Sequence, residues 1–122
     1  MPYEDLLSGL IELHVLYHAA EEEIFGLGML KELKRHGYLI SPGTLYPMLH
    51  RLTHRGYLQV RELKLGRTRR RLYRATAKGQ RALIAVRCHV QELVGELEES
   101  AHRARKPEQK RDRVMARKRR GP

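Results

Sequence analysis

The segment SPGTLYPMLHRL (residues 41–52) decides the fold, because it combines a helical apolar spacing with an unusual start. Its apolar side chains recur at i, i+3, i+4 and i+7, the spacing of a helix face that packs on a core: Leu45, Met48, Leu49 and Leu52. The other face, extended to residue 55, carries hydrogen-bonding, aromatic and cationic groups and no acid: Thr44, Tyr46, Pro47, His50, Arg51, His54 and Arg55. We therefore expect one face to be buried and the other to meet an anionic partner.

The start of this helix admits two interpretations. Ser41 is a favourable N-cap and Pro42 suits the first helical position, in which case Pro47 removes one early hydrogen bond. Alternatively, Thr44 is the effective cap and Pro47 lies in the first turn, where a missing N–H costs little. Both interpretations predict a rigid, exposed helix N-terminus, shaped by Pro42 and Gly43, whose backbone N–H groups can bind a phosphate.

Two further helices are expected before this segment. Residues 5 to about 20 begin with acids and carry one apolar stripe, which predicts a first helix: Leu6, Leu10, Leu13 and Tyr17. A second helix should end at Gly37, directly after three basic or titratable residues, KRH. Only the tripeptide YLI then leads to Ser41, and two helices joined by so short a turn predict a helix-turn-helix.

A β-hairpin and a last helix are expected after it. The segments YLQVREL (57–63) and RRRLYRA (69–75) are rich in strand-forming residues, and KLGRT between them suits a hairpin loop with a basic tip. Thr76 can cap a long final helix. That helix carries apolar residues at alternating spacings of three and four, which predicts a helix–helix seam too short to act alone: Leu83, Val86, Val90, Leu93 and Leu97.

Composition limits the class of protein. The 122 residues suffice for one domain, and 25 Lys and Arg against 14 Asp and Glu, with a pI near 10.3, suit a polyanionic partner. Nucleic acid is favoured over an anionic membrane surface. Residues 101–122 hold ten of the cations against two acids and include Pro107, so we expect a basic, mobile tail there. With no long apolar run, no signal-peptide pattern and a single Cys88, a cytoplasmic protein is expected.

The order helix, helix, helix, hairpin, helix is that of a winged helix with an added dimerisation arm. Within that order, KELKRHGYLISPGTLYPMLHRLTHRGYL followed by YRATAKG resembles the PadR family of bacterial transcriptional regulators. The expected fold is mainly α with a β-hairpin wing. The expected parts are a winged-helix DNA-binding domain at 1–76, a dimerisation helix at 77–100 and the basic tail at 101–122.

The resemblance also implies where DNA binds. In the third helix, Arg and His can reach base edges, and Thr and Tyr can bind phosphate. The arginines of the wing are expected to contact the DNA backbone or the minor groove. The alternative for these arginines is a hydrated turn, since exposed charge at a hairpin tip also discourages edge pairing. Lys64 is a lesser candidate. The predicted contacts are Ser41, Pro42, Gly43, Thr44, Tyr46, His50, Arg51, Arg67, Arg69 and Arg70.

From these features we expect a homodimeric regulator that binds a palindromic double-stranded operator, and the PadR resemblance implies that it is a repressor. An effector is conceivable, but the chain has no Trp and one Phe, and nothing in it identifies a ligand. The alternative is a basic RNA-binding or assembly protein, which would need no dimer. Enzymatic activity is not expected, because phosphate-binding loops, paired carboxylates and a base for Cys88 are missing from the sequence.

A metal site is the weakest of the hypotheses. His14, His18 and Glu22 are spaced i, i+4 and i+8 on the first helix, and Cys88 and His89 lie on the last, which could present ligands to a transition metal. Solvated or partly buried histidines explain the same pattern. Because the sequence holds no tight Cys/His cluster, we expect neither a specific metal site nor a cofactor.

Overall fold

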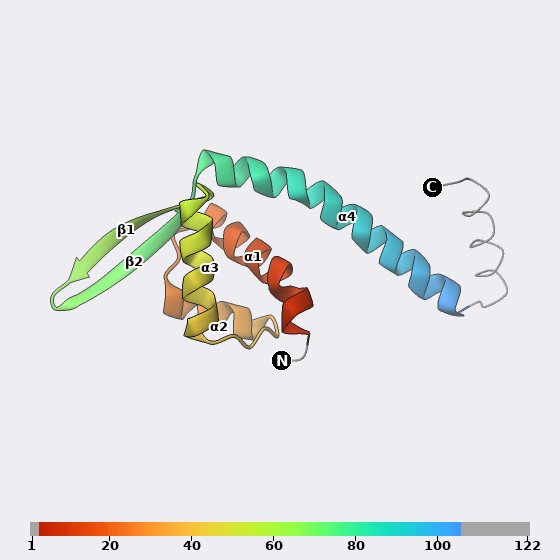
Figure 1. Ribbon diagram of the computed structural model, residues 1–122, viewed down its shortest axis with the longest axis horizontal. Helices are drawn as coiled ribbons and strands as arrows, with labels where there is room; N and C mark the ends of the chain where they lie inside the picture. The colour runs from red at the N-terminus through yellow and green to blue at the C-terminus, as the bar shows by residue number, and fades with distance from the viewer. Residues whose placement is uncertain (1–2, 106–122) are drawn as a thin grey trace. The chain divides into compact units, whose positions relative to one another are not determined.

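The computed structural model describes residues 3–105, which form four helices and one two-stranded antiparallel sheet (Figure 1). The chain order is α1 (Glu4–Glu21), α2 (Gly26–Arg35), α3 (Pro42–His54), β1 (Leu58–Leu65), β2 (Thr68–Ala75) and α4 (Ala77–Arg105). This is the predicted winged helix-turn-helix followed by a long helix. None of these helices, within residues 3–105, is long and apolar enough to cross a membrane.

The division between two compact units falls inside α4, between Ala85 and Val86. Leu83, which the spacing assigned to the dimer seam, packs partly against the core of the first unit. The helix also continues to Arg105 instead of ending near Ser100, with Arg103 paired to Glu99 one turn earlier. The expected tail is therefore helical over its first five residues. Residues 106–122, on which the rest of that prediction falls, lie outside the described residues.

The core of the first unit confirms the apolar face of the quoted segment. Leu45, Met48, Leu49 and Leu52 are all buried, and they meet side chains from α1, α2 and the sheet. Burying one such side chain contributes about 1.5–3 kcal/mol. Helix α1 contributes a different set from the stripe that predicted it: Ile11, Val15, Leu16 and Ala19. Of the stripe itself, Leu6, Leu10 and Tyr17 are exposed.

The first interpretation of the α3 start is confirmed. Ser41 is the N-cap in an extended conformation, and its carbonyl accepts hydrogen bonds from the backbone N–H groups of Thr44 and Leu45, at 3.0 and 3.1 Å. Pro42 occupies the first turn, so Pro47 lies inside the helix and lacks the N–H that would bond Gly43. The Ser41 hydroxyl contacts the Thr44 hydroxyl at 3.3 Å and does not cap the backbone.

The predicted glycine stop at Gly37 is a Schellman cap. Gly37 has φ 91°, its N–H donates to the Lys34 carbonyl, and the N–H of Tyr38 donates to the Leu33 carbonyl at 2.9 Å. The end of α3 repeats this arrangement at Gly56, with φ 83°. Since only glycine adopts such values of φ at low cost, these two residues set the directions in which the chain leaves α2 and α3.

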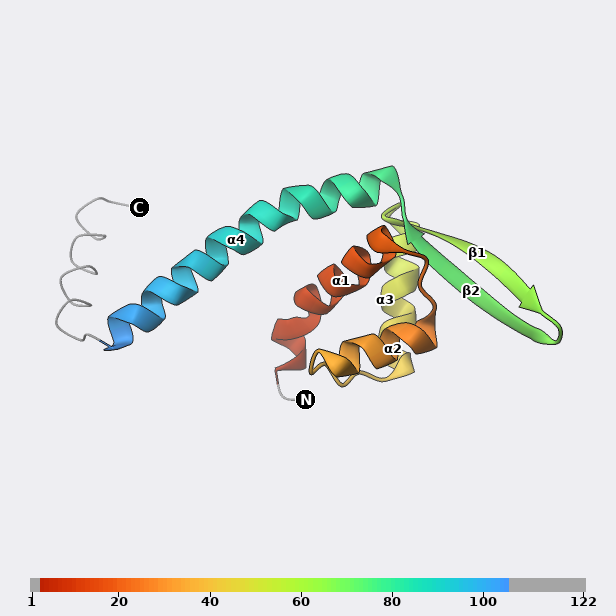
Figure 2. The ribbon, with the colours of Figure 1, turned by 180° about the vertical axis from the view of Figure 1, so that it is seen from behind.

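The hairpin is longer than predicted and its loop is shorter. Strands β1 and β2 pair in register from Leu58 opposite Ala75 to Leu65 opposite Thr68, which leaves a two-residue turn of Gly66 and Arg67. The prediction of a five-residue loop at 64–68 was wrong. Gly66, with φ 61°, supplies the positive φ that the first position of a tight two-residue turn needs, so the strands pair up to Leu65 and Thr68. Figure 2 shows the hairpin extending away from α1, α2 and α3.

Two connections hold the base of the hairpin to the segment between α1 and α2. Ile24 and Tyr73 exchange backbone hydrogen bonds of 2.9 and 2.8 Å. Arg61 donates two side-chain hydrogen bonds to Glu23, at 2.6 and 2.7 Å, and this pairing lowers the pKa of the Glu23 carboxyl. The wing is thus fixed at its base relative to the first two helices.

The motif YRATAKG acquires a structural explanation at the start of α4. The Thr76 hydroxyl caps the helix by accepting the N–H of Gly79 at 3.0 Å and donates to the Gly56 carbonyl. Lys78 donates to the Arg55 carbonyl at 2.7 Å and lies over the Tyr57 ring. Gly79 has no room for a side chain, because a Cβ there would overlap the Tyr57 carbonyl oxygen.

Gly79→Ala is therefore expected to destabilise the protein by about 1–3 kcal/mol, the usual cost of forcing an extra carbon into a packed site. Thermal unfolding followed by circular dichroism measures this. Gly95→Ala is the matched control, since a Cβ at residue 95 meets nothing within 4 Å. The control should be stabilised by about 0.5–1 kcal/mol through helix propensity. Equal melting temperatures for the two variants would contradict the steric account.

Candidate DNA-binding surface

The outer face of α3 presents every helix residue that the sequence singled out. All seven are exposed: Ser41, Pro42, Gly43, Thr44, Tyr46, His50 and Arg51. The apolar face of the same helix is buried, so α3 is held rigidly with its polar face outward. The rings of His50 and His54 stack one turn apart, with centroids separated by 6.5 Å.

Tyr46 is exposed but packs closely against the start of α2. It retains 49% of its accessible surface, yet its ring lies so close to Gly26 that a Cβ at that residue would overlap it. Gly26 is the first residue of α2. The absence of a side chain there lets the Tyr46 ring cross the start of α2, which positions its phenol group at the junction of α2 and α3.

Arg51 is turned toward α1. Its guanidinium donates a hydrogen bond of 3.2 Å to the carboxylate of Glu12, and both side chains are partly exposed. Exposed ion pairs of this kind contribute only about 0.2–1 kcal/mol, so a DNA phosphate or base edge can displace Glu12 at little cost. The sequence alone could not show this pairing, because it joins residues that are 39 positions apart.

The register of the hairpin separates the three predicted wing arginines. Arg67 lies in the turn, Arg69 is paired across the sheet with Lys64, and Arg70 is paired with Leu63. Since neighbouring residues of a strand point to opposite faces, Arg69 and Lys64 share one face and Arg70 lies on the other. Lys64, the lesser candidate from the sequence, therefore lies beside Arg69 on one face of the hairpin.

Arg70 has a contact of its own. Its guanidinium carbon lies 4.4 Å from the centre of the Phe25 ring, a cation–π geometry. Phe25 is the N-cap of α2. This contact ties the hairpin to the segment before α2, so Arg70 holds the wing in place in addition to carrying positive charge.

The histidines suspected of metal binding have a different third member from the one predicted. His14 and His18 on α1 face His36 at the end of α2, and one ring nitrogen of each lies within 4.8 Å of the others. Glu22 is not part of this group, and the exposed Cys88 belongs to the second unit. Burial, together with the neighbouring charges of His36 and His18, lowers the pKa of His14.

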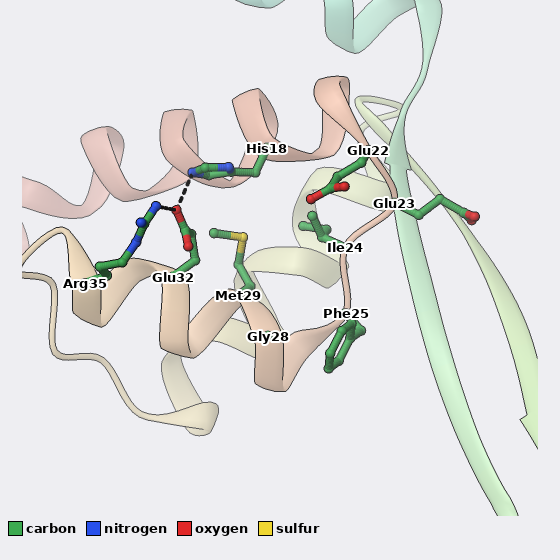
Figure 3. A pocket seen from close by; sticks show the side chains of 9 residues that line it. All are labelled: His18, Glu22, Glu23, Ile24, Phe25, Gly28, Met29, Glu32 and Arg35. Atoms are coloured by element: carbon green, nitrogen blue, oxygen red, sulfur yellow. Dashed lines mark hydrogen bonds and ion pairs between the residues drawn. The ribbon is translucent and has the colours of Figure 1, made fainter.

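A cavity of about 420 Å³ lies between α1 and α2, beside these histidines. Figure 3 shows His18 at one end of it, facing the carboxylate of Glu32, with Arg35 on the other side of that carboxylate. Arg35 donates a 2.6 Å hydrogen bond to Glu32, which lowers the pKa of the Glu32 carboxyl. The remaining lining residues mix acids with apolar groups: Glu22, Glu23, Ile24, Phe25, Gly28 and Met29.

Known proteins match this sequence and fold. A model of the transcriptional regulator PadR-like family matches residues 15–85. Transcriptional regulator Rv3488 of Mycobacterium tuberculosis is 46% identical over 87 residues, covering 71% of this chain and 81% of that protein.

Solved structures of PadR proteins have a fold similar to that of this chain. A PadR family transcriptional regulator from Eggerthella lenta superposes with a TM-score of 0.71 at 30% identity, covering 78% of this chain and 84% of that one. The fold is also similar to that of Bacillus subtilis PadR in complex with operator DNA, with a TM-score of 0.58 at 20% identity over 62% of this chain and 45% of that one.

Proposed function

This chain belongs to the PadR-like family of transcriptional regulators, and from that membership we propose that it is a dimeric repressor of a palindromic DNA operator. The observation that carries the proposal is the outer face of α3, which is exposed, free of acids and held rigid by a fully buried opposite face. A major groove accepts a helix of this kind. We infer no catalytic role for Cys88, because the family is one of regulators.

In the proposed complex, α3 enters the major groove with its N-terminus foremost. No side chain caps the first turn of α3, and the backbone N–H of Gly43 can donate to a phosphate, whereas Pro42 has no N–H and those of Thr44 and Leu45 donate to the Ser41 carbonyl. Thr44 and Tyr46 contact the DNA backbone, and His50 and Arg51 reach base edges once Arg51 leaves Glu12. The wing adds Arg67, Arg69 and Lys64, with Arg70 supporting the hairpin from its contact with Phe25.

We propose that the dimer forms through the apolar residues of α4, aided by α1. Leu93 and Leu97 keep 53% and 60% of their surface exposed within one chain, and Val86 and Val90 lie on the same face of the helix. On α1, the exposed apolar residues Leu6, Leu10 and Tyr17 form a second such stripe. Exposed apolar surface in continuous stripes is typical of a protein–protein interface.

The experiment that tests this function is a selection of duplexes from random DNA by the full-length protein. We expect an enriched inverted repeat whose half-sites lie about one helical turn, roughly 10 base pairs, apart, because a two-fold dimer reads a two-fold site. Enrichment of a single half-site would contradict the dimer. If no duplex is enriched while structured RNA is retained, the RNA-binding alternative replaces the operator proposal.

A further inference from the structure

We propose that His14, His18 and His36 form a binding site for a divalent transition-metal ion of the zinc type, with Glu32 as the fourth ligand, and that metal binding controls the proposed interaction with DNA. The site joins the middle of α1 to the C-terminal end of α2. The regulatory half of this inference rests on the proposed function, whereas the metal site itself does not.

The geometry of the three histidines suits one small ion. His14 and His18 are four residues apart on α1 and so project from the same side of the helix. The His36 ring lies across from them, with centroid distances of 5.2 Å to His14 and 6.0 Å to His18. A tetrahedral zinc ion with bonds of about 2.0–2.1 Å needs ligand atoms about 3.3 Å apart. The present spacing, within 4.8 Å, closes to that value through modest side-chain rotations.

Glu32 is the fourth ligand of the proposed site, and its carboxylate must move toward His14 to join the three histidines, whose ring nitrogens alone lie within 4.8 Å of one another. One of its carboxylate oxygens lies 3.2 Å from Nε2 of His36 and 3.7 Å from Nε2 of His18, so the nitrogens of two imidazoles already converge on it. Arg35 contacts the same oxygen at 2.6 Å, and Figure 3 shows the contacts of His18 and Arg35 with Glu32. Metal binding thus replaces the Arg35 contact or leaves it on the outer carboxylate oxygen as a supporting partner.

The donor types select the class of metal. Three imidazole nitrogens and one carboxylate favour Zn²⁺, Co²⁺, Ni²⁺ or Cu²⁺. Mg²⁺ and Ca²⁺ require mostly oxygen ligands and are disfavoured. The cavity of about 420 Å³, which both His18 and Glu32 line, provides a path for the ion from solvent.

The surroundings of the cluster hold the rings in position. The edge of the Tyr38 ring packs on His14 with centroids 5.0 Å apart. His36 is the C-cap of α2, and the backbone bonds of the Schellman motif at Gly37 and Tyr38 fix it there. Both Tyr38 and His36 belong to the turn of the helix-turn-helix.

This position links metal binding to DNA recognition. His36 precedes Pro42, the first residue of α3, by six positions, and the intervening segment is the turn that orients α3. An ion shared by α1 and α2 fixes the end of α2 against α1 and thereby selects one orientation of that turn. A ligand that binds one orientation more tightly than another shifts the equilibrium between them, and couplings of this type typically change affinity about 5- to 150-fold.

The first test is titration of the full-length protein with Co²⁺, followed by its visible absorption, and competition with Zn²⁺. We expect one equivalent per chain with the intense spectrum of a tetrahedral site. His36→Ala and His14→Ala should weaken Co²⁺ binding by more than about 100-fold, since loss of supporting residues alone costs 10- to 100-fold. His36 is exposed, so its replacement leaves the core intact, and circular dichroism verifies the fold.

Glu22→Gln is the matched control, because Glu22 lines the cavity but lies outside the ligand cluster. It should bind Co²⁺ as the unsubstituted protein does. Retention of the tetrahedral spectrum in His36→Ala, or its loss in Glu22→Gln, would refute the site in favour of the helix-spaced set His14, His18 and Glu22. A weak octahedral spectrum in the unsubstituted protein would refute it altogether.

The regulatory half is tested by measuring affinity for the selected operator with saturating Zn²⁺ and with a chelator. We expect a difference of at least about fivefold in the unsubstituted protein and in Glu22→Gln, and none in His36→Ala. Metal binding with no change in operator affinity would overturn the regulatory role. Failure to find an operator would overturn the proposed function, while the cobalt result would still decide whether the metal site exists.

Discussion

Replacing both Val90 and Leu93 by Glu is expected to convert the dimer into a monomer. Within one chain Val90 is half-buried and Leu93 is exposed, so the substitutions should leave the monomer folded. In the proposed dimer the same side chains face the partner, and burying four carboxylates without counter-charges costs several kcal/mol. Analytical ultracentrifugation should show the monomer, and affinity for the inverted repeat should fall by more than about 100-fold as one half-site is lost.

The matched control places two Glu residues on the opposite face of the same helix segment. Cys88 and Gln91 are exposed and lie roughly 170° and 130° around α4 from the centre of the seam formed by Val86, Val90, Leu93 and Leu97, at about 100° per residue. The Cys88→Glu, Gln91→Glu variant should therefore stay dimeric with unchanged operator affinity. If the seam variant is a dimer, the interface lies elsewhere, and the exposed stripe of Leu6, Leu10 and Tyr17 becomes the next surface to substitute.

Local features of the fold were predictable because local interactions determine them. The buried face of α3 follows from the spacing of Leu45, Met48, Leu49 and Leu52, and the helix ends follow from the left-handed conformations of Gly37 and Gly56. The choice between Ser41 and Thr44 as cap was not predictable, since both are good caps. The hairpin turn was misjudged because pairing up to Leu65 and Thr68 depends on the geometry of Gly66 within the sheet.

Contacts between distant residues account for the rest of the candidate site. Arg51 pairs with Glu12, Arg70 stacks on Phe25, and Tyr46 packs on Gly26, and each pairing depends on how two elements meet. His36 was missed for the same reason. Glu32 lies four residues before His36, but one His–Glu pair does not make a cluster, and only the packing of α2 on α1 brings His36 to His14 and His18.

Substitutions in α3 and deletion of the basic tail should change DNA binding in different ways. Tyr46→Ala or Arg51→Ala should lower affinity for the operator by about 1–3 kcal/mol and affinity for random DNA much less, because Arg51 reads base edges and the backbone contact of Tyr46 fixes the register of α3 on the duplex. Tyr46→Phe keeps the ring against Gly26 and removes only the hydroxyl, so it separates loss of packing from loss of a polar contact. Fluorescence anisotropy with the two duplexes measures both affinities.

Deleting residues 106–122, which lie outside the described part of the chain, removes eight Lys and Arg and two acids. Because phosphate contacts are independent of sequence, the deletion should weaken operator and random DNA alike. Each lost contact should also flatten the slope of log K against log salt by about 0.9. The ratio of specific to non-specific affinity should therefore survive the deletion and collapse in the α3 variants. The opposite pattern would be a loss of specificity on truncation and no loss of specificity in Tyr46→Ala and Arg51→Ala. That result would mean that the tail, and not α3, recognises the DNA sequence.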